Sequence, residues 1–277
     1  MSRWFPDALQ IALAPDQVVV EDLATGWHRL GPKPRILRRQ VLPTVGEPGR
    51  MDWAGALRVL RRVLEAQDQR YCDVTVILAN SFVRYALVPQ SNLLSADQET
   101  SVLRHCFHEI YGAAAEHWEL RLSAASGMPL QPATGVDCTL LDELRTLFPG
   151  DRLRLRSIQP RLMAVCNQHR AALSGGPSWL LLAEPGTLCL GLIADGGLTR
   201  LRSMRSGHNW AAELPTVLER EACLAELDET PGDLLLWHRD GPLPDMLDAG
   251  SLRLHLLQDP LPVETAAVSE DLAIAGS

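Results

Sequence analysis

The chain has 277 residues, which is long enough for two lobes with cores of their own. Hydrophobic residues make up 46% and charged residues 22%, an ordinary balance for a soluble globular protein. The net charge of -8 argues against a nucleic-acid-binding protein, because such proteins normally carry a basic face.

No segment is expected to span a membrane. The longest apolar stretch, residues 179–194, is interrupted by Glu184 and Pro185, so it cannot form a continuous apolar helix of about 20 residues. Pro6 and Asp7 likewise interrupt any signal-peptide core. We therefore expect a cytoplasmic protein, which could still lie peripherally at the inner membrane.

The first half of the chain alternates strands and helices. Residues 8–20 are predicted to form a β-hairpin around the turn Ala14-Pro15-Asp16-Gln17, followed by a Pro-rich, basic connection over residues 31–43. The elements expected next are a helix capped by Asp52, strands at 74–79 and 83–88, a helix from the Ser95–Gln98 capping box to Tyr111, a strand at 118–122, a helix at 140–148, a strand at 152–156 and a helix starting near Pro160.

A boundary is predicted at Ser174-Gly175-Gly176-Pro177, beyond which the pattern begins again with strands. A three-stranded meander is expected over residues 179–204, with turns at Glu184-Pro185-Gly186 and Asp195-Gly196-Gly197. The remaining predicted elements are a helix at 209–227, a strand at 233–237, a short helix at 243–247 and a strand at 251–257. Because both halves repeat one plan, we expect two facing α/β lobes with a cleft between them.

Three blocks carry a family resemblance. Residues 180–187 (LLLAEPGT), the turn at Asp195 and residues 202–207 (RSMRSG) have the layout of strand, turn, strand and Gly turn; residues 233–247 (DLLLWHRDGPLPDML) and 76–89 (VILANSFVRYALVP) are the other two blocks. In order and spacing they resemble PilM and the cytoplasmic domain of GspL, actin-like proteins of pilus assembly and type II secretion. The resemblance implies an actin-like (ribonuclease H-like) two-lobe α/β fold with duplicated β-meander plus α/β units.

The resemblance also implies a division of the chain. Residues 1–175 would form a first lobe that includes an inserted subdomain of the pilus and secretion type. Residues 176–262 would form the second lobe, and residues 263–277 a loose C-terminal tail.

The three loops that contact nucleotide in actin-like ATPases depart from the family pattern here. Such loops use Asp-x-Gly, in which the Asp holds hydrated Mg²⁺ and the Gly lets backbone N–H groups reach the phosphates. Here no Gly follows Asp16, and Ala183 stands where the second Asp is expected. His238, Arg239 and Asp240 stand where paired glycines are expected, so their side chains should crowd the base. The residues assigned to this vestigial nucleotide cleft are Asp16, Ala183, Gly186, Thr187, Gly207, Arg239 and Gly241.

Two other groups of residues invite a functional interpretation. The segment His105, Cys106, His108 and Glu109 contains metal-ligating types, but Cys106 belongs to the apolar side of the predicted helix, so we expect no metal site. Arg152, Arg154 and Arg156 share one strand face, which is either a solvated surface or a docking patch for an acidic partner segment or an anionic membrane.

By resemblance, the chain is expected to be a nonenzymatic scaffold of a type IV pilus or type II secretion platform, without a bound cofactor. It would bind a short cytoplasmic segment of an inner-membrane platform protein, and a homodimer is also open. The alternative is a divergent actin-like ATPase or small-molecule kinase in which Asp16 or Asp195 carries Mg²⁺.

Overall fold

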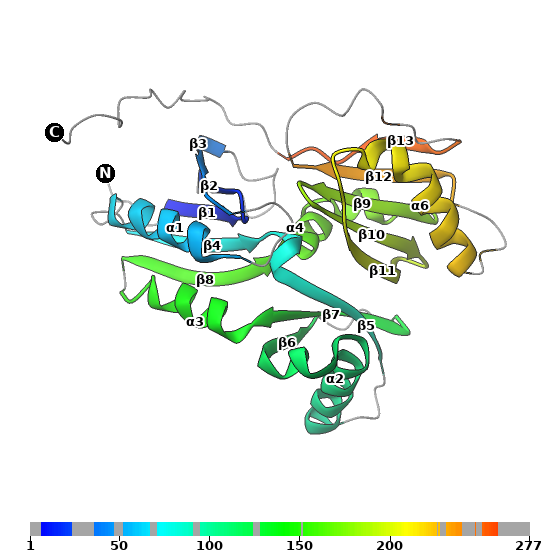
Figure 1. Cartoon of the computed structure of the whole chain (residues 1–277), viewed down its shortest axis with the longest axis horizontal. Helices are drawn as coiled ribbons and strands as arrows, with labels where there is room; N and C mark the ends of the chain where they lie inside the picture. Colours follow the sequence, from blue (N-terminus) through cyan, green and yellow to red (C-terminus); the bar gives the residue numbers. More distant parts are fainter. Residues whose placement is uncertain are drawn as a thin grey trace.

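The computed structural model describes residues 7–23, 36–46, 52–66, 71–90, 95–123, 128–150, 152–225, 227, 231–239, 247 and 251–259. Within these residues the chain forms two five-stranded sheets and one three-stranded sheet (Figure 1). The two large sheets share one arrangement, in which three antiparallel strands are extended by two parallel strands. The second large sheet repeats these pairings strand for strand.

The first large sheet has the strand order β3-β2-β1-β4-β8. Its elements are β1 (Asp7–Leu13), β2 (Gln17–Leu23), β3 (Ile36–Pro43), α1 (Ala54–Ala66), β4 (Cys72–Leu78), α3 (Cys138–Thr146), β8 (Leu153–Pro160), α4 (Arg161–Gln168) and α5 (Arg170–Leu173). The predicted hairpin is confirmed, because the Ala14 N–H donates to the Gln17 carbonyl at 2.9 Å. The predicted cap of α1 is confirmed too, since a carboxylate oxygen of Asp52 accepts the Ala54 N–H at 3.1 Å.

The second large sheet has the strand order β11-β10-β9-β12-β13. Its elements are β9 (Ser178–Glu184), β10 (Thr187–Ala194), β11 (Gly197–Arg205), α6 (Trp210–Leu224), β12 (Asp233–His238) and β13 (Arg253–Leu256). The predicted meander is therefore confirmed. Every residue of the central strand β9 is buried, because α6 covers one of its faces and the first lobe packs against the other. Most of the short helix predicted at 243–247, and the whole predicted tail, lie outside the described residues.

The three-stranded sheet is inserted between β4 and α3. It has the order β5-β7-β6 and contains η1 (Asn80–Phe82), β5 (Val83–Pro89), α2 (Ala96–Tyr111), η2 (Gly112–His117), β6 (Trp118–Leu122) and β7 (Leu130–Asp137). The capping box of α2 is confirmed, since the Ser95 N–H donates to the Gln98 side chain at 2.8 Å and the Gln98 N–H to the Ser95 hydroxyl at 3.4 Å. Gly112 ends the helix with a φ of 65°, as its position predicts.

Strand β3 corrects the prediction of a connection over residues 31–43. From Ile36 the chain pairs with β2 along its length, up to Pro43 opposite Gln17. Its burial pattern is mostly exposed or intermediate because β3 is the edge strand of the sheet. An edge strand needs few apolar residues, so its charged sequence resembles a loop.

Strand β7 was also missing from the prediction, because Pro132 and Gly135 both argue against a strand. The Pro132 carbonyl accepts the N–H of Ser123, one residue beyond the end of β6. Pro132 therefore lies just past the end of its pairing with β6, where its missing N–H costs no hydrogen bond to β6. At Gly135 a methyl group would come within 2.9 Å of the Phe107 ring and 3.0 Å of Leu120 and Trp118. Packing beneath the strand therefore requires a residue that sequence propensity disfavours.

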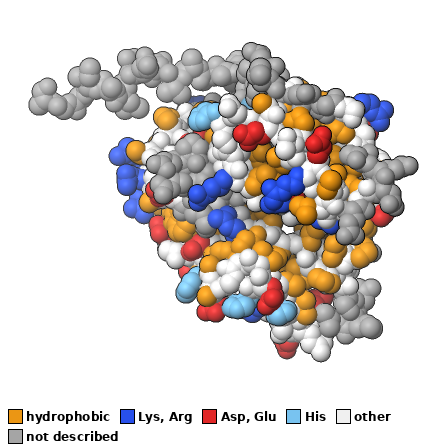
Figure 2. Space-filling model, turned by 45° about the vertical axis from the view of Figure 1, so that its right-hand side comes forward, with side chains coloured by type: hydrophobic (Ala, Val, Ile, Leu, Met, Phe, Trp, Pro, Cys, Tyr) orange, Lys and Arg blue, Asp and Glu red, His pale blue; other side chains and the backbone are white. Residues whose placement is uncertain are grey.

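The surface carries charges of both signs. On the face shown in Figure 2, the described basic and acidic side chains are interspersed among apolar ones. Among the helices of the described residues, none combines the length and the apolar character needed to cross a membrane.

Candidate functional site: an interlobe cleft closed by side chains

A cavity of about 420 Å³ lies between the two lobes. One wall is formed by Ala12 of β1, Ala14 of the hairpin turn and Val19 of β2, and the opposite wall comes from α4 and the end of β12. The small side chains of Ala12 and Ala14 leave the space open. Amide side chains of Gln10, Gln17, Gln159, Asn167 and Gln168 line the cavity beside these apolar walls.

The hairpin turn of the first lobe is joined to the end of β12 by an ion pair. The two terminal nitrogens of Arg239 lie 3.1 and 2.5 Å from the two carboxylate oxygens of Asp16, which is a bidentate arrangement. The Arg239 side chain is only 6% exposed and that of Asp16 is 23% exposed. The Arg239 N–H also donates to the Ala183 carbonyl at 3.1 Å, which fixes the start of its side chain against β9. Two groups assigned to the nucleotide cleft therefore bind each other.

A second link between the lobes is built around Trp237 of β12. The guanidinium carbon of Arg161 on α4 lies 4.9 Å from the centre of the Trp237 ring, a cation–π distance. The indole N–H donates to Asp259 at 3.1 Å, and the Gln168 amide of α4 donates to the same carboxylate oxygen at 3.2 Å. Asp259 therefore connects α4 of the first lobe to β12 of the second.

The third link is the buried carboxylate of Glu184, the last residue of β9. It accepts the backbone N–H of Asn80 at 2.7 Å, and its other oxygen lies 4.0 Å from Nε of Arg161. Asn80 in turn accepts the Tyr85 hydroxyl at 2.7 Å, which extends the polar network to β5 of the inserted sheet. Burial raises the pKa of Glu184, and the nearby Arg161 opposes this shift.

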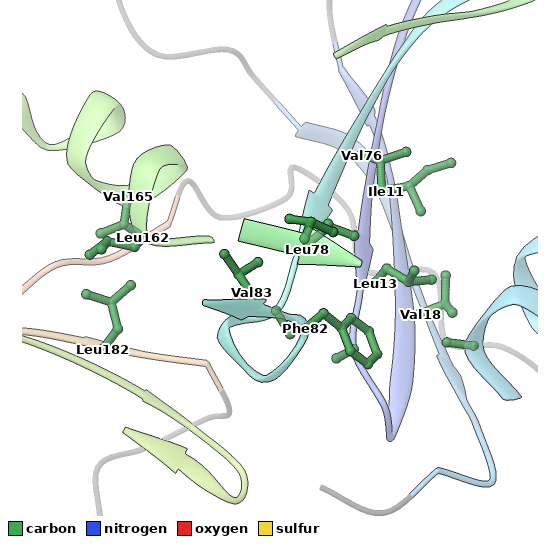
Figure 3. Packing of buried hydrophobic residues seen from close by; sticks show 14 of the residues in the cluster. Ile11, Leu13, Val18, Val76, Leu78, Phe82, Val83, Leu162, Val165 and Leu182 are labelled. Carbon is green, nitrogen blue, oxygen red and sulfur yellow. The ribbon is translucent and has the colours of Figure 1, made fainter. Parts of the chain in front are cut away.

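Apolar side chains surround this polar link. Leu162 and Val165 of α4 point toward Leu182 of β9, and Val83 of β5 lies beside them (Figure 3). All four residues are buried in one cluster that spans both lobes. The lobes therefore share a continuous core next to the cavity.

Within the cavity, Glu21 of β2 is also engaged. It lies 3.5 Å from Nε of Arg39 and accepts the Gln10 amide at 2.9 Å. Burial raises the pKa of Glu21, while Arg39 acts in the opposite direction. The carboxylates that line or border the cavity (Asp16, Glu21 and Asp259) thus each have a basic or amide partner from this chain.

The remaining residues assigned to the vestigial cleft are spread over the second lobe. Ala183 is buried in the cluster beneath α6, so the structure does not bring its side chain to Asp16. Gly186 has a φ of 76° in the turn between β9 and β10, Thr187 begins β10, and Gly207 follows β11. The Ser206 N–H donates to the Gly186 carbonyl at 3.2 Å, which brings those two turns together. Gly241 lies outside the described residues.

The position of His238 corrects an expectation. Its ring was expected to crowd the base, but it lies 5.8 Å from the Trp210 ring of α6. In the β12–β9 ladder His238 is opposite Ala183, so both residues belong to the face that α6 covers. The residue that reaches the cleft from this loop is therefore Arg239.

Sequence reasoning missed several residues of the links, namely Glu184, Arg161, Trp237 and Asp259. One signal was available, because Glu184 is the single charged residue in a buried strand over 178–184 whose other residues, apart from Ser178, are apolar. A buried strand tolerates a carboxylate only where a partner compensates it. The partner is the backbone N–H of Asn80, and the sequence cannot indicate it because every residue except proline has such a group.

The other sequence candidates lie away from the cleft. His105, His108 and Glu109 are exposed on α2 with Cys106 half-buried, and the described part of the chain contains no group of three or more His, Cys, Asp or Glu that could hold a metal ion. Arg154 and Arg156 both pair with Asp73, at 2.9 and 3.0 Å. Arg152 instead lies over the Tyr71 ring at 5.6 Å, so the three arginines do not act as one group.

Asp195, the other aspartate considered for Mg²⁺, occupies the turn between β10 and β11 with a φ of 54°. This turn lies at the opposite end of β10 from the Glu184–Thr187 turn. The length of β10, eight residues, separates them by about 25 Å. Asp195 is thus remote from the turn that would hold the second phosphate loop.

No protein-family model matches the sequence, and no curated protein matches it significantly. Solved structures do resemble it. A chain of the PilM-PilN type IV pilus biogenesis complex is 14% identical with a TM-score of 0.60, covering 83% of this chain and 81% of that one. A Bacteroides thetaiotaomicron protein with an actin-like ATPase fold and unknown function is 12% identical with a TM-score of 0.58, covering 88% and 87%.

A third structure, the cytoplasmic domain of EpsL, an inner membrane component of the Vibrio cholerae type II secretion system, is 14% identical and covers 95% and 90%. Its TM-score of 0.49 is too low to add to the fold argument. At these identities the first two likenesses establish the fold alone. The resemblance seen in the sequence blocks is confirmed at that level, and the chain is a two-lobe α/β protein with the actin-like fold.

Proposed function

We propose that this chain is a nonenzymatic cytoplasmic scaffold of a type IV pilus or type II secretion inner-membrane assembly platform, and a pseudo-ATPase of the actin-like superfamily. The observation that carries the proposal is the Asp16–Arg239 ion pair. The aspartate that would hold hydrated Mg²⁺ is bound instead by a guanidinium from the opposite lobe. A cation at Asp16 would have to compete with this guanidinium for the carboxylate oxygens.

The pilus and secretion context of the proposal rests on the similarity to the PilM-PilN complex. PilM is found there with PilN, and we propose by analogy a membrane-platform partner that contributes a short cytoplasmic segment. The inserted sheet β5-β7-β6 supports the same assignment, because the sequence block over 76–89 that resembles pilus and secretion proteins begins it. We propose the lobe boundaries at 175 and 262 from this resemblance to pilus and secretion proteins.

Capture from the host cell tests the scaffold. The tagged full chain is cross-linked in cells, purified, and its bound proteins are identified by mass spectrometry, with an excess of untagged chain as the competitor. We expect a membrane-anchored pilus or secretion platform protein to be enriched and to be lost on competition. Enrichment of soluble metabolic enzymes alone would contradict the proposal.

A further inference from the structure

A groove of about 430 Å³ lies on the first lobe, formed by the C-terminal half of α1, the segment after α3 and the start of β8. Its floor consists of Leu64, Leu147, Phe148 and Leu153. Leu64 is 7% exposed, whereas the other three are half-buried against the core of the lobe. We call this surface the α1–α3 groove.

The rim of the α1–α3 groove is basic. Arg61 and Arg152 both line it and both are exposed, and Glu65 is the one acidic residue among the described lining residues. Two more exposed arginines, Arg58 and Arg62, lie on the same helix α1. This part of the surface therefore carries an excess of positive charge, although the net charge of the whole chain is -8. These arginines attract an acidic partner to the rim.

The combination of an apolar floor and a basic rim selects the kind of occupant. Nucleic acid would satisfy the arginines but would leave the floor of leucine and phenylalanine uncovered. A lipid surface would meet the exposed rim, but a concave floor lies below the plane that headgroups reach. A polypeptide segment satisfies both, because one apolar side chain can fill the floor while a neighbouring carboxylate meets the rim.

We propose that the α1–α3 groove binds a short acidic and apolar segment of a partner protein, with a Leu, Ile or Phe side chain on Phe148 and an Asp or Glu carboxylate at Arg61 and Arg152. The proposal rests on the scaffold function described above but not on a particular pilus or secretion system. It assigns the partner to a surface that is separate from the interlobe cavity, because no residue lines both.

A peptide-display selection on the purified full chain tests the groove. Random short peptides are selected for binding, and the selected peptides are measured against wild type and the variant Arg61→Glu/Arg152→Glu. We expect the selected peptides to pair Asp or Glu with Leu, Ile or Phe. We expect their dissociation constants to rise about tenfold or more in the variant, since two attractions become repulsions.

The matched control is Arg220→Glu, which reverses an exposed arginine on α6 without touching the groove and should leave peptide binding unchanged. Phe148→Ala should weaken binding without altering any charge, which separates the floor from the rim. Selected peptides that lack acidic residues, or that bind the Arg61→Glu/Arg152→Glu variant as tightly as wild type, would overturn the proposal. So would arginine-dependent binding to phosphatidylserine vesicles without any selected peptide.

The scaffold and the groove can fail separately. If the host-cell capture retains a platform protein in the Arg61→Glu/Arg152→Glu variant, the scaffold stands and the groove is wrong. If acidic peptides bind the groove but no platform protein is captured, the groove stands and the assigned system is wrong.

Discussion

At the scale of single residues, the two partners of the Asp16–Arg239 pair are not equivalent. Arg239 is almost fully buried, whereas water reaches Asp16, with side-chain exposures of 6% and 23%. Losing the carboxylate leaves a buried cation with less compensation, and losing the guanidinium leaves an anion that water can still solvate. The energetic cost of breaking a buried pair depends on which charge remains.

We therefore predict that Asp16→Asn lowers the free energy of unfolding by about 1–3 kcal/mol, and that Arg239→Gln lowers it by less. Urea unfolding of both single variants and the double variant measures the coupling between the two side chains. The double variant should cost less than the sum of the single variants. Strict additivity would show that the pair does not hold the lobes together.

The second prediction at this scale concerns Glu184. Its pKa is raised by burial, so the folded state keeps a proton that the unfolded chain releases at a lower pH. The stability from this group is full below the ordinary glutamate pKa and is lost as the pH rises through the raised pKa. Glu184→Gln keeps an acceptor for the Asn80 N–H but cannot ionise.

We expect the wild type to lose stability between about pH 5 and about pH 8, and Glu184→Gln to lose less over the same range. Urea unfolding midpoints at the two pH values provide the measurement, and Glu219→Gln on the exposed face of α6 is the control. Glu21 contributes in the same direction, so part of the pH dependence should remain in the variant. Equal slopes for wild type and Glu184→Gln would sink this account of the buried carboxylate.

At the scale of elements, the inserted sheet depends on close packing beneath β7. A methyl group on Gly135 would approach Phe107, Leu120 and Trp118 within 2.9–3.0 Å, so either the rings or the strand must move. We predict that Gly135→Ala lowers the free energy of unfolding by about 1–3 kcal/mol. Gly150→Ala is the matched control, because nothing lies within 4 Å of its added methyl group. Similar unfolding midpoints for the two variants would contradict the packing argument.

Some helices and strands could be predicted from the sequence alone, and others could not. Periodicity and capping predicted the first hairpin, α1, α2 and the meander β9–β11, because local signals such as the Ser95–Gln98 capping box decide those elements. Strands β3 and β7 were missed because their residues suit their positions in the tertiary structure. Strand β3 is an edge strand, and β7 packs closely against the layer beneath it. Local strand propensity does not reflect either position.

The candidate site was predictable in part. Asp16 and Arg239 were both placed at the cleft, but their 223-residue separation hides the ion pair between them. The links through Trp237, Asp259 and Glu184 depend on how the second sheet faces α4, which becomes visible only once the lobes are assembled.

At the scale of the whole molecule, two copies of one sheet plan lie side by side (Figure 1). The cavity lies between them, and side chains bridge the two lobes beside it. The bridges are the Asp16–Arg239 pair, the Trp237–Asp259–Gln168 group and the Glu184–Asn80 bond, next to a core shared by both lobes. This chain thus supplies its own contacts between the lobes. The lobe arrangement should therefore not require Mg²⁺ and a nucleotide.

Titration of the purified full chain with a fluorescent ATP analogue in the presence of Mg²⁺ tests whether this protein is a pseudo-ATPase. We predict no saturable binding in the micromolar range, because Arg239 binds the Asp16 carboxylate and each carboxylate that borders the described cavity has a partner in this chain. Magnesium-dependent binding with a micromolar dissociation constant, weakened by Asp16→Asn, would instead favour the ATPase alternative.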